Sequence, residues 1–230
     1  MTALAAALRA ISLAVVAVAL WWVAHPAAQN DASYYPLSAG MNWEYELTNT
    51  ANPDQPVRLR VVNSGRQRVG TWNAAVQRLE APGAIGFRYV FSDGELIALV
   101  AEQNPGKSEP SLLEKPSPIL RLPVEVGKSW ESETTSTAFA PGVKLPVTAT
   151  IESVGDHADS GIGSFENCVR VSSQGKVRIA GDLGSVEVRI DSKLWYAPGV
   201  GLVHLERRES IDRAEIPPVE MKYRLVARNT

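Results

Sequence analysis

The sequence has little cysteine and no excess of charge of either sign. Cys168 is the one cysteine among 230 residues, so a single chain can form neither a disulfide framework nor a cysteine-based zinc or iron–sulfur site. Lys and Arg number 23 against 25 Asp and Glu, for a net charge of -2. Because phosphate binding needs clustered basic residues, this balance predicts no nucleic acid partner. The 45% share of hydrophobic residues is typical of a folded chain.

The motifs that identify common enzymes are also missing. No G-x-S-x-G nucleophile elbow, H-E-x-x-H zinc pair or G-x-G-x-x-G dinucleotide turn occurs. Two G-K-S sequences, at 106–108 and 127–129, end like a phosphate-binding loop, but Ala101 and Leu122 stand where that loop needs an earlier glycine. We interpret both as turns. The sequence predicts no cofactor, and a hydrolase whose carboxylates are not singled out by any pattern is the minority hypothesis.

Metal and thiol chemistry have weak support in the sequence. Asp156-His157-Ala158-Asp159 offers too few oxygens for a calcium loop and too few ligands for zinc, so we expect a solvated hairpin tip and no metal. A cysteine nucleophile needs an imidazole to take its proton, and nothing in the sequence brings Cys168 to His157 or His204. A small packed side chain is the favoured interpretation of Cys168, and a reactive thiol is the alternative.

The longest apolar run lies near the start of the chain. Ile11–Ala24 holds 14 apolar or small residues, with Arg9 before it and the small residues Ala27 and Ala28 after it. As a helix this run is about 21 Å long, short of the roughly 30 Å hydrocarbon core. It predicts that residues 1–28 are a secretory signal peptide and that the protein is periplasmic or extracellular. The alternative is an uncleaved anchor in the inner membrane facing the periplasm, since no clean A-x-A site is present.

Beyond residue 30 hydrophobic and polar residues alternate. In VRLRVV, Val57, Leu59 and Val61 alternate with Arg58 and Arg60. This period of two is typical of antiparallel strands with one buried face. Turn residues separate such segments. The same alternation occurs at 43–47, 87–89, 147–151, 177–179, 186–190 and 221–228, with turn sequences at 92–94, 181–184 and 197–199.

The chain also contains an internal repeat. The pattern P-x-x-x-G-x-x-W-E-x-E occurs at 36–46 and again at 123–133, and looser correspondences join 70–76 to 163–169 and 91–97 to 196–203. We expect two copies of a roughly four-stranded unit, about 36–102 and 123–209, with a connector at 103–122 and a last strand near 219–228. Each half has an apolar face to cover. The prediction is an all-β fold: one domain, 29–230, as a curved antiparallel sheet, a sandwich or a partly open barrel, with two separate domains as the alternative.

Aromatic side chains are the candidate ligand-binding residues. In a curved sheet they can line a cavity, as in small barrels that hold an apolar ligand. The competing interpretation is a filled hydrophobic core. The candidates are Trp43, Tyr45, Trp72, Tyr89, Trp130, Trp195 and Tyr196.

Three motifs together resemble a known group. They are Y-P-L-x-x-G-x-x-W-x-Y at 35–45, G-S-F-x-x-C-V at 163–169 and W-Y-A-P-G-V-G-L-V at 195–203. They resemble the TapB-like group of exported bacterial proteins, many of them lipoproteins, for which no activity is agreed. This sequence lacks the lipobox cysteine of the lipoprotein members. A more distant likeness is to the periplasmic lipoprotein carriers LolA and LolB, which curl an antiparallel sheet around a hydrophobic groove.

Two functions of different classes follow. The first is a non-enzymatic exported protein that binds a lipid or another apolar or amphipathic molecule, or an exported peptide, in the curved sheet. The second is a structural or assembly subunit of a bacterial envelope complex, with exposed strand edges and the 103–118 connector as its contact surface. Membrane contact is expected only through residues 1–28, if they are not cleaved.

The repeat generates the first testable prediction. If Trp43 and Trp130 are equivalent core anchors, replacing either with alanine lowers the free energy of unfolding by roughly 3–5 kcal/mol, measured by urea denaturation. Unchanged stability together with lost ligand uptake would make them binding residues instead.

Overall fold

The structure is a computed structural model that describes residues 34–181 and 184–229, and within these residues the regular secondary structure is almost entirely β-strand. The predicted signal segment, 1–28, lies outside the described residues. No helix among them has the length and hydrophobicity needed to cross a membrane. The strands are β1 (Asn42–Asn49), β2 (Val57–Val69), β3 (Trp72–Ala81), β4 (Ala84–Ser92), β5 (Leu96–Gln103), β6 (Ser111–Arg121), β7 (Ser129–Thr135), β8 (Lys144–Ser160), β9 (Gly163–Gly181), β10 (Gly184–Ala197), β11 (Gly201–Ile211) and β12 (Val219–Asn229).

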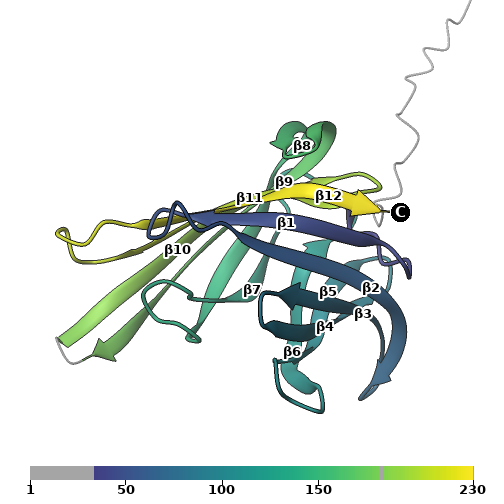
Figure 1. Cartoon of the computed structure of the whole chain (residues 1–230), viewed down its shortest axis with the longest axis horizontal. Helices are drawn as coiled ribbons and strands as arrows, with labels where there is room; N and C mark the ends of the chain where they lie inside the picture. Colours follow the sequence, from purple (N-terminus) through teal and green to yellow (C-terminus); the bar gives the residue numbers. More distant parts are fainter. Residues whose placement is uncertain (1–33, 182–183, 230) are drawn as a thin grey trace, which may run out of the picture.

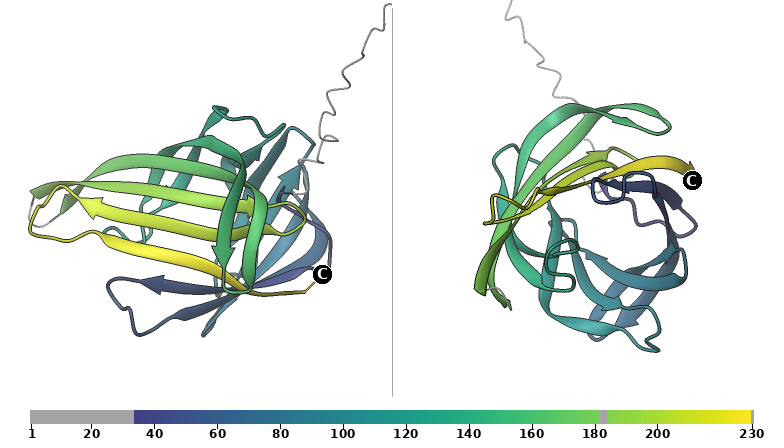
Figure 2. Two further views of the ribbon diagram at one scale, coloured as in Figure 1. Left: turned by 90° about the horizontal axis from the view of Figure 1, so that it is seen from above. Right: turned by 60° about the vertical axis from the view of Figure 1, so that its left-hand side comes forward.

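All of these strands belong to one antiparallel sheet that curls into a partly open barrel, which confirms the predicted fold class (Figures 1 and 2). The strand order is β6-β5-β4-β3-β2-β1-β12-β11-β10-β9-β8-β7. Every pair in the sheet joins strands that are consecutive in the chain except β1 with β12, and the consecutive strands β6 and β7 are left as the two edges. The sheet has twelve strands rather than the eight or nine expected. The first repeat range holds β1 to β5 and the second β7 to β11, and each is followed by a further strand, β6 or β12.

The two edge strands, β6 and β7, meet without a backbone ladder. Pro116 and Pro118 have no backbone N–H to donate, so this part of β6 is poorly suited to form a hydrogen-bonded ladder with β7. Side chains bridge the seam instead: the Ser117 and Ser132 hydroxyls lie 3.0 Å apart, and the Ser132 hydroxyl and the Trp130 indole N–H donate to the Pro118 carbonyl at 2.9 and 3.2 Å. Residues 103–122, expected to connect the two copies, therefore contain a strand of the barrel wall.

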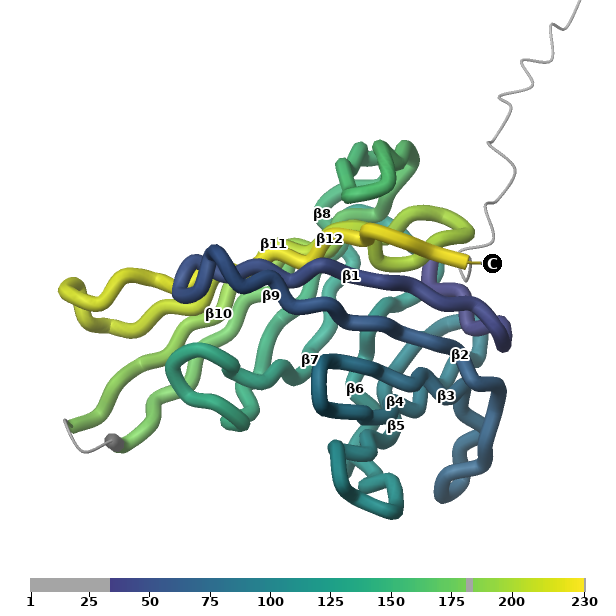
Figure 3. Tube along the Cα trace, viewed as in Figure 1, coloured from purple at the N-terminus to yellow at the C-terminus, as the bar shows by residue number. Residues whose placement is uncertain are grey.

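The hairpin of β8 and β9 bends back over the outside of the barrel (Figure 3). Register shifts interrupt its pairing between Ile151 and Asp156, where the two strands change direction. At its tip the Gly161 N–H donates to the Leu225 carbonyl of β12 at 2.8 Å. A side chain at Gly161 would collide with Val226, which explains the glycine. The bent hairpin contributes Ala158, Phe165 and Cys168 to a hydrophobic cluster that also includes Trp43, Tyr45, Trp195 and Leu225.

The β2–β3 hairpin has a similar irregularity. Its pairing shifts between Asn63 and Arg66, and Gly70 at its turn packs against Leu112 of β6. The residues beyond the shift join strands β4 and β5 in a second small cluster, formed by Val69, Ala74, Val76, Tyr89, Val100 and Ala101 with Trp72, Phe87 and Phe91 around it.

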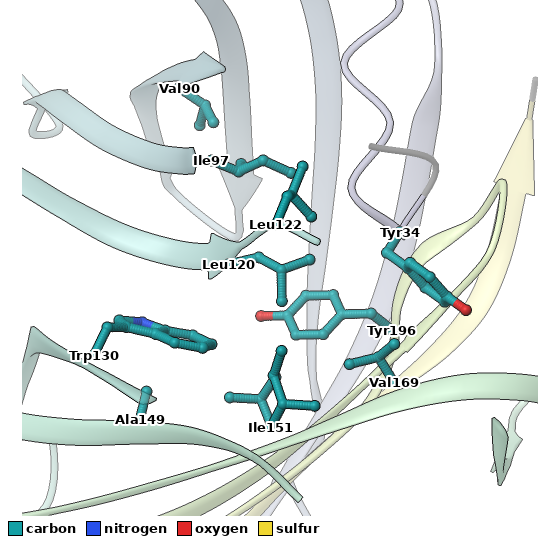
Figure 4. Packing of buried hydrophobic residues seen from close by; sticks show 11 residues of the cluster. Tyr34, Val90, Ile97, Leu120, Leu122, Trp130, Ala149, Ile151, Val169 and Tyr196 are labelled. Carbon is teal, nitrogen blue, oxygen red and sulfur yellow. The ribbon is translucent and has the colours of Figure 1, made fainter. Parts of the chain in front are cut away.

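The largest hydrophobic cluster joins strands from both halves of the chain (Figure 4). Tyr196 lies in its middle, with Leu120, Ile151 and Trp130 around the ring. The contributing strands include β4, β5 and β6 on one side of the seam and β7, β8, β9 and β10 on the other. This packing holds the two edges of the sheet together where backbone hydrogen bonds do not.

The loop between β7 and β8 is fixed by one buried carboxylate. Glu209 of β11 has no exposed side-chain surface, and it accepts hydrogen bonds from the Ser136 hydroxyl at 2.8 Å and from the backbone N–H groups of Thr137 and Ala138 at 3.0 and 3.1 Å. The Arg207 guanidinium completes the group at 2.7 Å. Burial acts to raise the pKa of Glu209, but the two backbone donors, the Ser136 hydroxyl and the Arg207 charge outweigh it and lower that pKa.

Replacing Glu209 with glutamine is expected to lower the free energy of unfolding at pH 7 by about 3 kcal/mol, because the buried donors and Arg207 lose their charged partner. A carboxyl whose folded-state pKa is lowered adds stability above its unfolded pKa of about 4.3, and this is lost as the pH falls through the folded pKa. The difference between wild type and variant should therefore shrink below about pH 4. Urea titrations from pH 3 to 8 measure it, with the exposed Glu220→Gln as control; a constant difference would contradict the assignment.

Candidate functional site

The barrel encloses a cavity of about 460 Å³. Every strand from β1 to β12 contributes at least one lining residue, so the cavity is the hollow of the curled sheet itself. Both sides of the seam reach it, through Ser117 and Pro118 of β6 and Trp130 and Ser132 of β7. The volume falls within the roughly 300–1,000 Å³ of small-molecule sites. The apolar part of the lining includes Leu59, Val61, Leu79, Leu99, Ile119, Val147, Val171, Leu194, Leu202 and Leu205.

Four of the candidate aromatics line this cavity: Trp43, Tyr45, Trp130 and Tyr196. The polar atoms of three of them are already paired. The Trp43 indole donates to the Val200 carbonyl at 2.7 Å, the Tyr45 hydroxyl to the Leu202 carbonyl at 3.0 Å, and the Trp130 indole to Pro118. These rings are therefore held in place by the backbone and present apolar faces to the cavity. Trp43 and Trp130 are also 4% and 5% exposed, so they are core residues as well as lining residues.

The other three candidates, Trp72, Tyr89 and Trp195, are not among the lining residues. Trp195 precedes the cavity-lining Tyr196, and neighbouring residues of a strand point to opposite faces. Its indole donates to the Asp156 carboxylate at 3.1 Å beneath the bent β8–β9 hairpin. Tyr89 and Trp72 pack in the cluster of the β2–β3 hairpin, where the Trp72 ring lies 4.8 Å from that of Phe91. The structure thus divides the predicted set between two faces of the sheet.

A chain of polar groups fixes the segment before β1 against the cavity. The Tyr35 hydroxyl donates to Gln77 at 3.0 Å, and the Gln77 amide donates to Asn63 at 3.1 Å. Asn63 in turn donates to the carbonyls of Pro36 and Ser38 at 3.2 and 3.1 Å. Tyr35, Pro36 and Gln77 line the cavity, so this chain builds part of its wall. Sequence reasoning missed these residues, because a buried amide carries no periodic signal.

Charged residues also reach the cavity, and the alternation pattern did not identify them. Arg88 of β4 and Glu102 of β5 face each other in adjacent strands, and both are lining residues. Their ion pair is loose, with Nε of Arg88 at 3.7 Å from Oε1 of Glu102. In the segment Phe87-Arg88-Tyr89 the sequence suggests an exposed arginine between two buried aromatics. Arg88 is indeed exposed and Tyr89 is buried, and Phe87 packs with Tyr89 against the β2–β3 hairpin. The alternation did not indicate that the exposed face at Arg88 borders the cavity.

The remaining sequence candidates have structural roles. Gly106 and Gly127 have positive φ values of 79° and 87° and lie in turns, the conformation expected for the two G-K-S sequences. Lys128 donates to the carbonyls of Leu122 and Pro123, both at 2.9 Å. Burial, with Asp156 and Glu166 nearby, raises the pKa of the Cys168 thiol to about 11. No cluster of three or more metal-ligating side chains occurs among the described residues.

The comparisons with known proteins identify a fold and no family. No protein-family model and no curated protein matches the sequence. A solved protein of Parabacteroides distasonis, provisionally described as a lipoprotein, is similar over 85% of this chain and 98% of its own, with 13% identity and a TM-score of 0.53. A provisionally described exported protein of Bacteroides fragilis, with a YmcC-like fold, matches over the same shares with 11% identity and a TM-score of 0.43. At these identities the first likeness shows a shared fold alone.

Asn63 is expected to be essential to the cavity wall. Asn63→Ala leaves two backbone carbonyls and the buried Gln77 amide without their partner, and should lower the free energy of unfolding by about 2–3 kcal/mol. The exposed Asn73→Ala on the next strand is the matched control and should change it by less than about 0.5 kcal/mol. Equal effects of the two substitutions in urea denaturation would refute the role of the amide chain.

Proposed function

We propose that this protein is a non-enzymatic exported binding protein that holds an apolar or amphipathic molecule inside its barrel. The observation that carries the proposal is the aromatic-lined cavity of about 460 Å³. A small barrel whose interior is meant only as a core fills it with side chains, whereas one that binds a ligand keeps space. The paired polar atoms of Trp43, Tyr45 and Trp130 favour apolar contact with the occupant.

Export is the second part of the proposal. Residues 1–28 have the composition of a secretory signal, and the Parabacteroides protein of similar fold is described as a lipoprotein. We therefore place the protein on the envelope side of a bacterial cell, in the periplasm or outside. Membership of the TapB-like group and likeness to LolA and LolB stay predictions, because the comparisons with known proteins support neither of them.

The contacts between β6 and β7 weigh against the alternative function, a subunit that assembles with other proteins through exposed strand edges. A partner strand would add to β6 or β7, but Ser117, Pro118, Trp130 and Ser132 already bind these two edges to each other. The same contacts weigh against an extended peptide as ligand, because it would need the same edges. A lipid-like occupant needs no backbone partner, so the cavity suits it better.

Native mass spectrometry of the protein purified from its own envelope tests the proposal. We expect a discrete extra mass that is absent under denaturing conditions. Ala149→Phe, which places a ring at a buried lining position, should abolish this mass, whereas Val126→Phe, at an exposed loop position, should keep it. Circular dichroism verifies that both variants fold. A bare monomer in wild type, or a stoichiometric protein partner, would overturn the proposal.

A further inference from the structure

Arg88 differs from Arg207, the other arginine of the cavity wall. The guanidinium of Arg207 is bound by Glu209, Thr134 and Thr135, whereas Glu133, which also lines the cavity, has a loose partner in Lys144 at 3.8 Å. Arg88, by contrast, donates no hydrogen bond to any residue that the structure describes, and its one charged partner is Glu102. About half of its side chain, 51%, is exposed, although it lies on the cavity wall.

The contact with Glu102 leaves most of the guanidinium available. At 3.7 Å it is a charge pair rather than a hydrogen bond, and it involves Nε. The two terminal nitrogens, which form the planar fork that matches a carboxylate, are unused. Glu102 is 36% exposed and also lines the cavity, so it competes with an anionic ligand rather than assisting it.

Two buried phenols lie within electrostatic range of Arg88. Burial raises the pKa values of Tyr35 and Tyr196, two lining residues, and the positive charge of Arg88 partly offsets the shift of both. The guanidinium therefore lies near two protonated phenols, at a half-exposed position of the cavity wall. Its neighbour across the β3–β4 pairing is Gln77, whose amide and carbonyl are already used by Asn63 and Tyr35.

From these observations we propose that Arg88 recognises the headgroup of the ligand and that the ligand is a single-chain amphiphile with a terminal carboxylate, a long-chain fatty acid. This inference rests on the proposed function. The tail would lie against Trp43, Trp130 and Tyr196, and the carboxylate would accept two hydrogen bonds from the guanidinium fork. A cavity of about 460 Å³ is near the lower end of ligand sites, which favours one chain over two.

Three amphiphiles built on C16 chains test the headgroup: palmitate, hexadecan-1-ol and hexadecyltrimethylammonium. Binding is followed by quenching of the fluorescence of the lining tryptophans and by titration calorimetry. In wild type, palmitate should bind most tightly. Arg88→Gln should weaken palmitate on the order of 10-fold to 100-fold, the effect of losing a hydrogen bond to a charged group, and leave hexadecan-1-ol unchanged.

Two further variants keep the test independent of folding defects. Glu102→Gln removes the competing carboxylate and should tighten palmitate by about threefold. Arg78→Gln is the matched control, because Arg78 lies between the lining residues Gln77 and Leu79 and so faces away from the cavity; it should change nothing. If palmitate and the alcohol bind equally, if the cation binds best, or if Arg88→Gln has no effect, the headgroup assignment is overturned. If none of the three binds wild type, the proposed function itself fails.

Discussion

The seam between β6 and β7 is the constraint on which the rest of the structure depends. At the corresponding junction of the other half, β12 and β1 pair from Asn42 and Asn229 to Asn49 and Met221, with one register shift between Glu44 and Tyr45. At the seam that ladder is missing, because Pro116 and Pro118 remove two of the donors it would need. The barrel is closed instead by the side chains of Ser117, Ser132 and Trp130 and by the large hydrophobic cluster. Side-chain closure does not require β6 and β7 to lie at the spacing of a backbone ladder, which leaves room between the walls of the barrel. The cavity borders this seam.

Several strands of this barrel have apolar residues on both faces, so the apolar residues of the outer face also need to be buried. The bent hairpins cover them. Trp195 and Tyr196 are adjacent, so one of them must face outward whatever the register. The outward residue is Trp195. Because the β8–β9 hairpin folds back over the sheet, Trp195 packs against a hydrophobic cluster and its indole donates a hydrogen bond to Asp156. The β2–β3 hairpin does the same for Tyr89 and Phe91. The irregular pairings at Asn63 and at Ile151 are the points that allow the bends. Both halves of the chain use this device, and the duplication expected from the repeated Trp motif stays a prediction.

The sequence predicted the all-β class and many of the strands, but not all twelve strands and not which side of each strand faces the interior. Alternation identifies a strand with two unlike faces, as in Val57 to Val61, but it cannot say which face is the interior once outer hairpins create a second buried layer. This explains why Trp43 and Trp130, marked by the repeat, lie at the cavity while Trp72 and Trp195 do not. It also explains why the place of Arg88 on the cavity wall was not anticipated: an arginine between aromatics correctly indicates an exposed side chain, but not that the exposed face borders a cavity. The prolines near Pro118 suggested a connector, because local chemistry does not distinguish a linker from an edge strand.

Arg88 and Arg207 line the same cavity, but their guanidinium groups are paired in different ways. Both are arginines of the barrel wall beside a glutamate. Arg207 is 13% exposed and its guanidinium is bound by Glu209 and by β7, so its desolvation is offset within the protein. Arg88 is left half in water with a distant partner, and a guanidinium in that state gains from any anion that completes its hydrogen bonds. This asymmetry between two arginines of one wall is the reason why we assign the proposed carboxylate recognition to Arg88 and a structural role to Arg207.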